Sequence, residues 1–396
     1  MTLSEFRLSR LTQAAKNANA DLLVASLPAN IMYISGFRSV PMEVLARTQT
    51  YALFSPESGE VRLVASIAEL PSIAERLGMD ANAFCYGAFR FGGMEGHELT
   101  KLLADAVENR NYASAEEALA AAIRDTGAKN VALDENHIYH PSWLKVESLC
   151  PGVNIFPGAE VFMRARMKKH PEEVAGLERS AEIAETALYT ALKGFRLGMT
   201  ELDLEHAYNC ELTRQGATPY FFVATAAQRA AYADTSNTSL VIEKGDMIRF
   251  DFGCMYNGYC SDLARTAVVG QPDEKIATRY RAVQCGTSAA IASIKPGVTT
   301  AEEVFEVAVR ETRANGMPDY KRHHCGHGIG VECYDFPSIA PGDKTVLEPG
   351  MTLCVETPFY ELGWGGVQIE DTIVIEETGA RCLDKTGDAL IVLEVE

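Results

Sequence analysis

Two kinds of hydrophobic pattern alternate along the first part of the chain. Short apolar runs typical of strands (DLLVASL, QTYALFS, EVRLVAS, NVALDEN) are interspersed with amphipathic runs typical of helices (LSRLTQAAKNANA, GHELTKLLADAVENR, AEEALAAAIRDTG). This mixture predicts an α/β domain around a mixed sheet over residues 1–160. A second domain over residues 161–396 is predicted to follow, because a strand-like piece there gives way to a helix opened by Pro171 and two glutamates.

A hairpin with two aspartates is predicted over residues 247–269. Two strand patterns flank an Asn-Gly pair, the strongest two-residue hairpin signal. In the register set by that turn, Asp251 opposes Ala264 and Gly253 opposes Asp262. Side chains alternate between faces with period two, so Asp251 and Asp262 are expected on one face as diagonal neighbours, roughly 7–8 Å apart at Cα. That separation suits two carboxylates that share a metal ion.

A second hairpin is predicted around the loop ELGWGG, with strands over residues 351–358 and 366–376. Glu356 and Glu370 are symmetric about Gly363 in the middle of this loop. They are therefore expected to be cross-strand partners. Each of the two hairpins thus brings two carboxylates together.

The two hairpins belong to segments that repeat each other. FRLGMTELDLEHAY around Gly198 matches IKPGVTTAEEVFEV around Gly297, and RQGATPY around Gly216 matches ANGMPDY around Gly316. The offset between matching positions is nearly constant at about 100 residues. A constant offset predicts an internal duplication, with one acidic hairpin from each half meeting at a common site.

Four carboxylates and one imidazole form the candidate metal site of the chain. The five residues are Asp251, Asp262, His327, Glu356 and Glu370. Taken singly, each acid is explained as well by a turn cap or a solvated position. Carboxylates that are buried together repel each other and lose their hydration, so a joint cluster is unfavourable as mere packing. Divalent cations would compensate for that repulsion.

Composition narrows the class of protein. The formal net charge of −18 argues against nucleic acid or an anionic membrane as a partner. No apolar run approaches the roughly 20 residues of a membrane span, and the first residues lack a signal-peptide core. Ten cysteines are scattered without a CxxC pair, which favours free thiols and a cytoplasmic enzyme. Cys260 and Cys354 each lie two residues from a candidate ligand along a predicted strand, so they are expected on the same face, and they are interpreted as small core residues.

The motifs DFG, GYCSD, GHGIG, VETP and GGVQIED resemble those of the creatinase/prolidase/methionine-aminopeptidase family. The match runs from about Glu172 to the end, and NIMYISGF at 30–37 resembles the creatinase-type N-terminal domain. The resemblance implies a creatinase-type N-terminal domain at 1–160 and a catalytic pita-bread domain with an internal duplication at 161–396.

The family binds two divalent cations, so the resemblance implies that the five candidate residues are ligands, with Asp262 and Glu370 bridging. Oxygen-rich ligation with one imidazole suits Mn, Co, Fe or Zn, and the sequence does not choose among them. Such cations lower the pKa of a water molecule and polarise a carbonyl. In the family, the residue that matches Glu356 is also general base and proton shuttle.

The prolidase and aminopeptidase P branches carry three accessory histidines, of which this chain retains one. His323 matches the first, whereas Tyr334 and Asp234 stand where the others are expected, with Tyr232 nearby as a hydrogen-bond donor. Tyrosine donates one hydrogen bond but does not carry a proton near pH 7, since its reference pKa is about 10. The resemblance therefore implies catalytic roles for Glu356, His323 and Tyr334 in an altered substrate shell.

Further residues have two readings each. Trp364 either lines the substrate pocket or simply packs in its hairpin, and His324 is explained as part of an exposed polar loop. Gln368 stands where many family members have arginine. A homodimer is implied by the resemblance, and Arg38 and Arg47 are candidates for a side chain that the partner contributes to hold a substrate carboxylate.

Three functions remain open from the sequence. The first is a dinuclear metal-dependent hydrolase of a peptide bond in short substrates, with Xaa-Pro dipeptidase or aminopeptidase as the default. The second is a hydrolase or lyase of a small non-peptide metabolite, as in creatinase-like and ectoine-hydrolase-like relatives. The third is a non-catalytic binding module, which typically loses ligands, so the complete set in this chain disfavours it.

Overall fold

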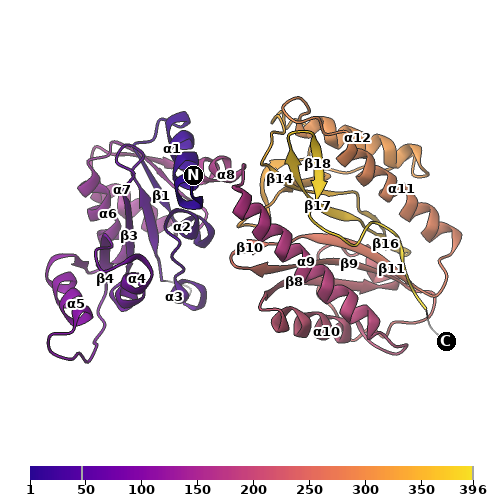
Figure 1. Ribbon diagram of the computed structural model, residues 1–396, viewed down its shortest axis with the longest axis horizontal. Helices are drawn as coiled ribbons and strands as arrows, with labels where there is room; N and C mark the ends of the chain where they lie inside the picture. The colour runs from indigo at the N-terminus through magenta and orange to yellow at the C-terminus, as the bar shows by residue number, and fades with distance from the viewer. Residues whose placement is uncertain (46–47, 395–396) are drawn as a thin grey trace. The chain divides into compact units, whose positions relative to one another are not determined.

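The computed structural model describes residues 1–45 and 48–394, and the chain divides into two compact units, Met1–Arg166 and Met167–Glu396 (Figure 1). The sequence predicts this boundary after residue 160, whereas the division follows helix α8 (Ala159–Arg166). Helix α8 belongs to the first unit because the Arg10 guanidinium donates hydrogen bonds to two of its last carbonyl oxygens, each at 3.3 Å.

The first unit is built on a seven-stranded mixed sheet in the order β5-β4-β3-β2-β1-β6-β7. Strand β2 pairs antiparallel with both β1 and β3, and the other neighbours are parallel. The strands are β1 (Leu22–Ala25), β2 (Tyr51–Phe54), β3 (Val61–Ser66), β4 (Ala83–Tyr86), β5 (Asn111–Tyr112), β6 (Asn130–Leu133) and β7 (Asn154–Pro157). The predicted α/β character and all four predicted strand runs are confirmed.

Helices of the first unit include the three that the amphipathic patterns predict, namely α1, α5 and α6. The α-helices are α1 (Leu3–Asn17), α2 (Pro28–Ser35), α3 (Val40–Val44), α4 (Leu70–Leu77), α5 (Glu98–Asn109), α6 (Ala115–Thr126), α7 (His140–Leu149) and α8. The apolar face of α6 packs on the sheet with Val24, Leu53 and Val131 in one buried cluster. Apolar burial on this face holds the mixed sheet and its helices together.

The second unit contains a larger sheet with the path β10-β9-β11-β17-β14-β12-β13, to which β8, β18 and β19 add at β9, β17 and β11. Its strands are β8 (Thr218–Ala226), β9 (Met247–Tyr256), β10 (Tyr259–Cys260), β11 (Leu263–Val269), β12 (Gly326–Gly328), β13 (Asp335–Ser338), β14 (Thr352–Glu356), β17 (Glu370–Glu376), β18 (Gly379–Cys382) and β19 (Ile391–Leu393). Strands β15 (Phe359–Glu361) and β16 (Gly365–Val367) form a separate small hairpin.

Two of the three cross-strand pairs predicted for the acidic hairpins are confirmed. Asp251 pairs with Ala264 across β9 and β11, and Glu356 pairs with Glu370 across β14 and β17. The predicted return strand over 259–269 is instead interrupted at Ser261 and Asp262, so Asp262 has no ladder pair with Gly253. The interruption arises because the Ser261 hydroxyl oxygen accepts a hydrogen bond from the backbone N–H of Cys254 at 2.9 Å in place of a ladder carbonyl.

The predicted strand over 366–376 is interrupted in a similar way between β16 and β17. There the Thr266 hydroxyl accepts a hydrogen bond from the Gln368 backbone N–H at 2.9 Å and donates one to its carbonyl oxygen at 3.0 Å. In both hairpins a side-chain hydroxyl thus takes the place of a backbone partner, next to Asp262 in the first and Glu370 in the second.

The second unit repeats one arrangement twice, as the sequence predicts. Helix α9 (Pro171–Lys193) precedes α10 (Glu201–Arg214), and α11 (Glu274–Ala292) precedes α12 (Ala301–Ala314). Both α10 and α12 begin with a capping box, and the capping threonine of each forms an isolated bridge, Thr200 with Val241 and Thr300 with Val346. The two halves of the sheet meet at the pair β11–β17.

All four helices of the second unit cover the same face of its sheet. Phe250 and Phe252 of β9 pack in one buried cluster with residues of α9 and α10. Leu353 of β14 and Ile373 of β17 pack in a second cluster with residues of α11 and α12. Because side chains alternate along a strand, residues adjacent to these in sequence, Asp251 among them, project from the opposite face.

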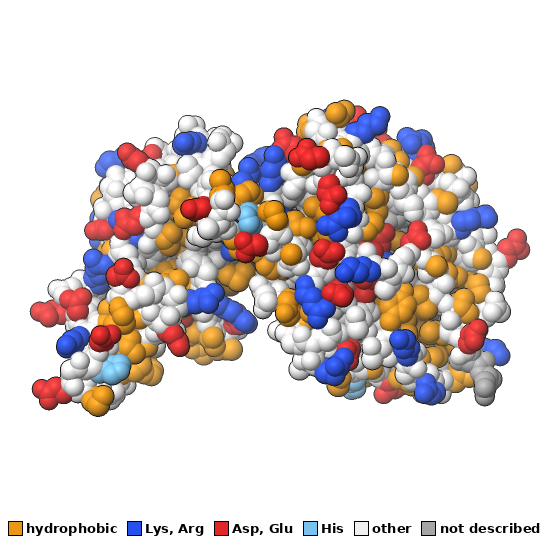
Figure 2. Space-filling model, viewed as in Figure 1, with side chains coloured by type: hydrophobic (Ala, Val, Ile, Leu, Met, Phe, Trp, Pro, Cys, Tyr) orange, Lys and Arg blue, Asp and Glu red, His pale blue; other side chains and the backbone are white. Residues whose placement is uncertain are grey.

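Charged side chains are interspersed on the visible faces of both units, with acidic and basic groups next to one another (Figure 2). Among the described residues, no helix combines the length and hydrophobicity that a membrane span requires.

Replacement of Gly326 by alanine is expected to lower the free energy of unfolding by more than about 2 kcal/mol. Gly326 lies at φ +134°, and an added Cβ would overlap the carbonyl oxygen of Cys354, so β12 and β14 would be forced apart. Urea denaturation of both proteins measures the difference. Gly92→Ala is the control, because nothing lies within 4 Å of its added Cβ. Equal stability of the two variants would contradict the close approach of these strands.

Candidate metal centre

A row of side chains across four strands carries three of the predicted ligands. Asp251 on β9 pairs with Ala264 on β11, Ala264 pairs with Glu370 on β17, and Glu370 pairs with Glu356 on β14. Cross-strand partners project from the same face of a sheet. The three carboxylates therefore lie on one line, on the face that the helices leave free.

A second row lies two residues away along β14 and β17 and extends to His327 on β12, and Asp262 adjoins it just before β11. His327 pairs with Cys354, and Cys354 pairs with Thr372. The Thr372 hydroxyl donates a hydrogen bond to the carbonyl oxygen of Asp262 at 2.7 Å. A step of two residues keeps the same face, so both rows look into one site.

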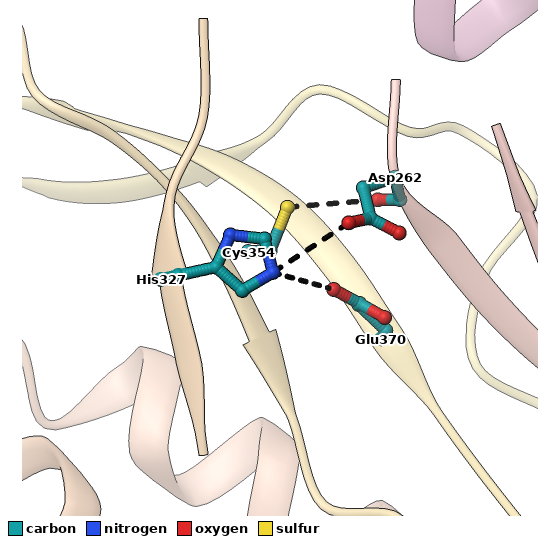
Figure 3. Close-up of side chains that lie close together, drawn as sticks. All are labelled: Asp262, His327, Cys354 and Glu370. Carbon is teal, nitrogen blue, oxygen red and sulfur yellow. Dashed lines mark hydrogen bonds and ion pairs between the residues drawn. The ribbon is translucent and has the colours of Figure 1, made fainter. Parts of the chain in front are cut away.

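Four side chains converge in the middle of this site. The ligand atoms of Asp262, His327, Cys354 and Glu370 all lie within 4.8 Å of one another (Figure 3). His327 Nε2 is 3.5 Å from Asp262 Oδ2 and 3.8 Å from Glu370 Oε1. Three of these residues come from strands β12, β14 and β17, and Asp262 comes from the interruption that precedes β11.

The unpaired atoms of this cluster fit a divalent cation. His327 Nδ1 lies 3.0 Å from the carbonyl oxygen of Gly328, an arrangement that places the ring proton on Nδ1 and leaves the lone pair of Nε2 directed at the carboxylates. Among the described residues, neither His327 Nε2 nor Glu370 Oε1 has a hydrogen-bond partner, although both atoms are buried. Buried polar atoms without partners are unfavourable, and a cation between them would satisfy both.

The carboxylates in the centre of the site repel each other strongly. Loss of hydration raises the pKa of Asp251 to about 6, with Glu356 adding to the rise and the Arg249 cation opposing it. Burial, followed by the charge of a neighbouring aspartate, raises the pKa values of Asp262 and Glu370 well above the ordinary range. Protons or cations must therefore neutralise this cluster.

Glu356 is the exception among the four carboxyl groups. Burial acts to raise its pKa, but His324 and Arg322 outweigh burial and hold the pKa below the ordinary value. His324 Nε2 lies 2.9 Å and Arg322 Nη2 3.6 Å from Glu356 Oε1. The Gln368 amide donates a hydrogen bond to the other carboxylate oxygen at 3.3 Å. Glu356 is therefore the carboxylate that stays ionised without a cation.

A buried guanidinium compensates Asp251 at the opposite end of the first row. Arg249 Nη1 donates to Gln368 Oε1 at 2.9 Å and lies 3.5 Å from Asp251 Oδ2. The Gln368 amide donates to the same Asp251 oxygen at 3.1 Å. Position 368 is where many members of the resembling family have arginine, so this chain provides the guanidinium from β9 instead of the Gln368 position. Arg249 was not among the residues expected from the sequence; strand period could have placed it on the face of Asp251, since it lies two residues earlier, but not its contact with Gln368.

The remaining donors of Arg249 fix a neighbouring segment of backbone. Its Nε donates to the carbonyl oxygen of Ala230 at 3.1 Å, and its Nη2 donates to those of Tyr232 and Ala233 at 2.8 and 3.0 Å. The ring of Tyr360 lies 5.3 Å from the guanidinium carbon. Arg249 therefore couples the position of Asp251 to the segment that contains Tyr232.

The neighbouring histidines are arranged differently from the expectation. His323 is exposed, and its ring contacts that of His324 edge-on at 4.3 Å. His324 is the histidine that approaches Glu356, so its interpretation as part of an exposed polar loop is wrong. Sequence spacing alone could not tell which of the two histidines contacts Glu356, because both follow Arg322 on one irregular segment. The catalytic role of His323 stays a prediction.

Tyr334 stacks on His327, with ring centroids 3.6 Å apart and planes 20° apart, and 61% of the residue is exposed. Partial burial, followed by the nearby carboxylates of Glu370 and Glu356, raises the pKa of Tyr334, so its hydroxyl stays protonated at neutral pH and can donate a hydrogen bond. The structure thus places Tyr334 beside the cluster, and its catalytic role stays a prediction.

The predicted substrate-binding residues lie in several places. Tyr232 is exposed, with the Arg229 guanidinium 5.6 Å from its ring centroid. Trp364 packs against Phe359 in the β15–β16 hairpin, with the Lys275 ammonium 4.5 Å from its ring, as the packing interpretation expects.

On helix α3 and the segment before it, Arg38 forms an exposed ion pair with Glu43. Arg47 lies outside the described residues. Asp234, at the position of an expected histidine, is exposed. None of these observations tests a role in substrate binding.

Comparison with known proteins agrees with this geometry. Residues 175–377 match Metallopeptidase family M24, and residues 7–168 match the Creatinase/Prolidase N-terminal domain. The chain belongs to metallopeptidase family M24. The family resemblance noted from the motifs is thereby confirmed, and the boundary between the two matches, at residues 168–175, lies close to the boundary between the two structural units. Enzymes of this family depend on divalent metal ions, in agreement with the donor cluster of His327 and the carboxylates.

Several relatives of this M24 chain are peptidases by name. Xaa-Pro dipeptidase from Pyrococcus furiosus is 35% identical over 234 residues, which cover 59% of this chain and 67% of that protein. Xaa-Pro dipeptidase from Lactobacillus helveticus is 27% identical over 392 residues, 98% of this chain and 99% of that protein. The solved Xaa-Pro dipeptidase from Bacillus anthracis has a TM-score of 0.81 at 24% identity, covering 98% of this chain and all of that one, and so shares the fold.

Replacement of Arg249 by glutamine is expected to reduce kcat by at least about tenfold at saturating metal, because Asp251 loses the cation that orients it. Adding Gln368→Arg to this variant is expected to recover part of the loss, since a guanidinium at position 368 again reaches Asp251. Steady-state kinetics of both variants measure the effect. Wild-type kcat in Arg249→Gln would contradict the positioning role, as would a double variant no better than the single one.

Removal of metal is expected to destabilise the protein more at pH 8 than at pH 5. The folded-state pKa values of Asp251, Asp262 and Glu370 are raised in the metal-free protein. The stabilisation from their protonation is complete at low pH and is lost as the pH rises through about 6 and above. Thermal melts of metal-loaded and metal-free protein at the two pH values measure this, and Glu370→Gln should weaken the dependence. A pH-independent difference in Tm would contradict the repulsion inferred for the cluster.

Proposed function

We propose that the chain is a dinuclear metal-dependent hydrolase that cleaves the peptide bond of short Xaa-Pro substrates, as a dipeptidase or aminopeptidase. The observation that carries this proposal is the convergence of four carboxylates and one imidazole on the helix-free face, with His327 Nε2 and Glu370 Oε1 unpaired. The names of the relatives support the substrate class.

The proposed cation ligands are the five residues Asp251, Asp262, His327, Glu356 and Glu370. Asp262 and Glu370 are assigned as the bridging carboxylates, because they lie in the centre of the cluster and have the most strongly raised pKa values. Mn, Co, Zn and Fe all suit this donor set. When bound, the two cations supply a water molecule of lowered pKa and polarise the carbonyl of the scissile bond.

Glu356 is the proposed general base. Arg322 and His324 keep it ionised, so it accepts the proton of the attacking water and passes it to the leaving nitrogen of the substrate. Tyr334 projects beside His327 with a protonated hydroxyl and donates a hydrogen bond to the oxygen that gains negative charge. His323, exposed next to His324, is the second proposed donor to substrate.

Substrate contacts are assigned to Tyr232, Trp364 and Arg47. Arg249 donates a hydrogen bond to the carbonyl oxygen of Tyr232 and also lies beside Asp251, to which Gln368 donates. A ligand that contacts the segment with Tyr232 is therefore linked to the metal centre through Arg249. Arg47 is assigned to a neighbouring copy in a homodimer. Val40, Val44 and Leu45, close to Arg47 in sequence, are exposed apolar residues that suit such an interface; these three are 57–71% exposed.

A cytoplasmic location is proposed from the thiols, since every cysteine that the structure describes is free. The net charge of −18 disfavours nucleic acid and anionic membranes as partners. A hydrolase or lyase of a small non-peptide metabolite is not favoured, because the relatives from Pyrococcus furiosus and Lactobacillus helveticus are dipeptidases by name. A non-catalytic module is not favoured either, because the candidate ligand set is complete.

Glu356→Gln is expected to lower kcat on Xaa-Pro dipeptides by about 10²–10⁴-fold, because the amide accepts no proton. The assay compares Mn- or Co-loaded wild type and variant on Xaa-Pro dipeptides, on dipeptides without proline, and on guanidino acids and cyclic amidines. Glu361→Gln is the control, since Glu361 pairs with Lys275 in the adjacent hairpin. Activity confined to the non-peptide compounds, or an undiminished Glu356→Gln variant, would refute the proposal.

A further inference from the structure

Two free thiols lie against Asp262 in the centre of the site. The Cys333 thiol donates a hydrogen bond to Asp262 Oδ2 at 3.0 Å. The Cys354 thiol lies 3.7 Å from the carbonyl oxygen of Asp262 and 3.6 Å from the Thr372 hydroxyl. Both cysteines are buried and free of disulfide bonds. Sulfur is thus present in a site whose other donors are oxygen and one nitrogen.

Cys354 belongs to the donor cluster itself. Its Sγ lies within 4.8 Å of the ligand atoms of Asp262, His327 and Glu370 (Figure 3). It is the cross-strand partner of His327 and lies two residues before Glu356, so it projects from the ligand face. Cys354 is fully buried, as its interpretation as a small core residue expects, but it lies on the ligand face, whereas its neighbours Leu353 and Val355 enter the core under the helices.

Two further atoms point to a ligand at this position. His327 Nε2 and Glu370 Oε1 are buried and have no hydrogen-bond partner among the described residues, and the residues are only 3% and 2% exposed. Both atoms belong to the cluster that contains Cys354 Sγ. The thiol is therefore one of several donors around a common centre.

We propose that Cys354 Sγ is a ligand of the cation held by Asp262, His327 and Glu370, which rests on the metal centre proposed above. The thiol proton is released to solvent when the sulfur–metal bond forms, so charge and atoms balance. With metal–sulfur bonds of about 2.3 Å and metal–nitrogen or metal–oxygen bonds of about 2.0–2.1 Å, only separations near the 4.8 Å limit of the cluster would have to shorten, by about 1 Å.

A sulfur donor changes which metal this position selects. Thiolate is a soft ligand that favours Zn, Co or Fe over Mn and Mg, whereas carboxylates suit the harder cations. The two positions of the centre then differ in chemistry. Asp251 and Glu356, with Arg249 and Arg322 nearby, provide an oxygen site, and Cys354 adds sulfur to the site that contains His327.

Cys333 is assigned a different task from Cys354. Its sulfur lies outside the four-donor cluster and donates its hydrogen bond to one carboxylate oxygen of Asp262. This bond orients Asp262 without adding a ligand. Cys333 and Cys354 therefore provide a matched comparison. Both are buried thiols in contact with Asp262, but only Cys354 is expected to bind the cation.

The test is titration of metal-free protein with Co²⁺, followed by absorption spectroscopy and metal analysis. Wild type is expected to develop the near-ultraviolet charge-transfer band of a cobalt–thiolate bond, and Cys354→Ser and Cys354→Ala are expected to lose it. Cys333→Ala should keep the band, as should Cys254→Ala, which removes a buried thiol on the helix-covered face of β9. The ratio of Zn to Mn affinity is expected to fall at least about tenfold in Cys354→Ser.

X-ray absorption of the Co-loaded wild type detects a cobalt–sulfur distance directly and needs no variant. Stoichiometric cobalt without a charge-transfer band or a cobalt–sulfur distance would overturn the assignment of Cys354 and leave the metal centre intact. A band that survives in Cys354→Ala but disappears in Cys333→Ala would overturn it in favour of Cys333. If wild type bound no cobalt, or Glu370→Ala bound as much as wild type, the metal centre itself and this inference would both fail.

Discussion

Repulsion among four carboxylates on one face of a sheet is the constraint on which the rest of this site depends. The protein compensates the two ends of the row with its own cations. Arg249 lies beside Asp251 at one end, and Arg322 and His324 lie beside Glu356 at the other. The middle of the row has no such partner, so Asp262 and Glu370 need a proton or a bound cation. Two buried atoms without a hydrogen-bond partner among the described residues, His327 Nε2 and Glu370 Oε1, lie at this middle position.

The duplicated architecture explains why the ligands are divided between distant segments. Asp251 and Asp262 come from the first half of the second unit, whereas His327, Glu356 and Glu370 come from the second half. The halves meet at the β11–β17 pair, where Ala264 faces Glu370. Neither half contains a full donor set, so the site exists only when both halves fold against each other. The helices cover the opposite face and leave the ligand face free.

Gln368 and Tyr334 stand where the motif resemblance led us to expect arginine and histidine. In this structure Arg249 donates a hydrogen bond to the Gln368 side chain, whose amide donates to Asp251 and Glu356. Tyr334 replaces an expected histidine and stacks on His327. An exchange of this kind preserves the charge near Asp251 but alters the shape of the space around it.

Local rules were sufficient for the sheet register of the ligands. The turn at Asn257 and the symmetry about Gly363 determine which residues face each other, because a tight hairpin sets its own register and side chains alternate with period two. Tertiary structure alone decided that His324 and not His323 approaches Glu356, that Arg249 meets Gln368, and that Cys354 joins the donor cluster. Those contacts join segments that are far apart in the chain. Alternation along a strand predicts on which face of the sheet a side chain lies, but not which residue from another segment it contacts there.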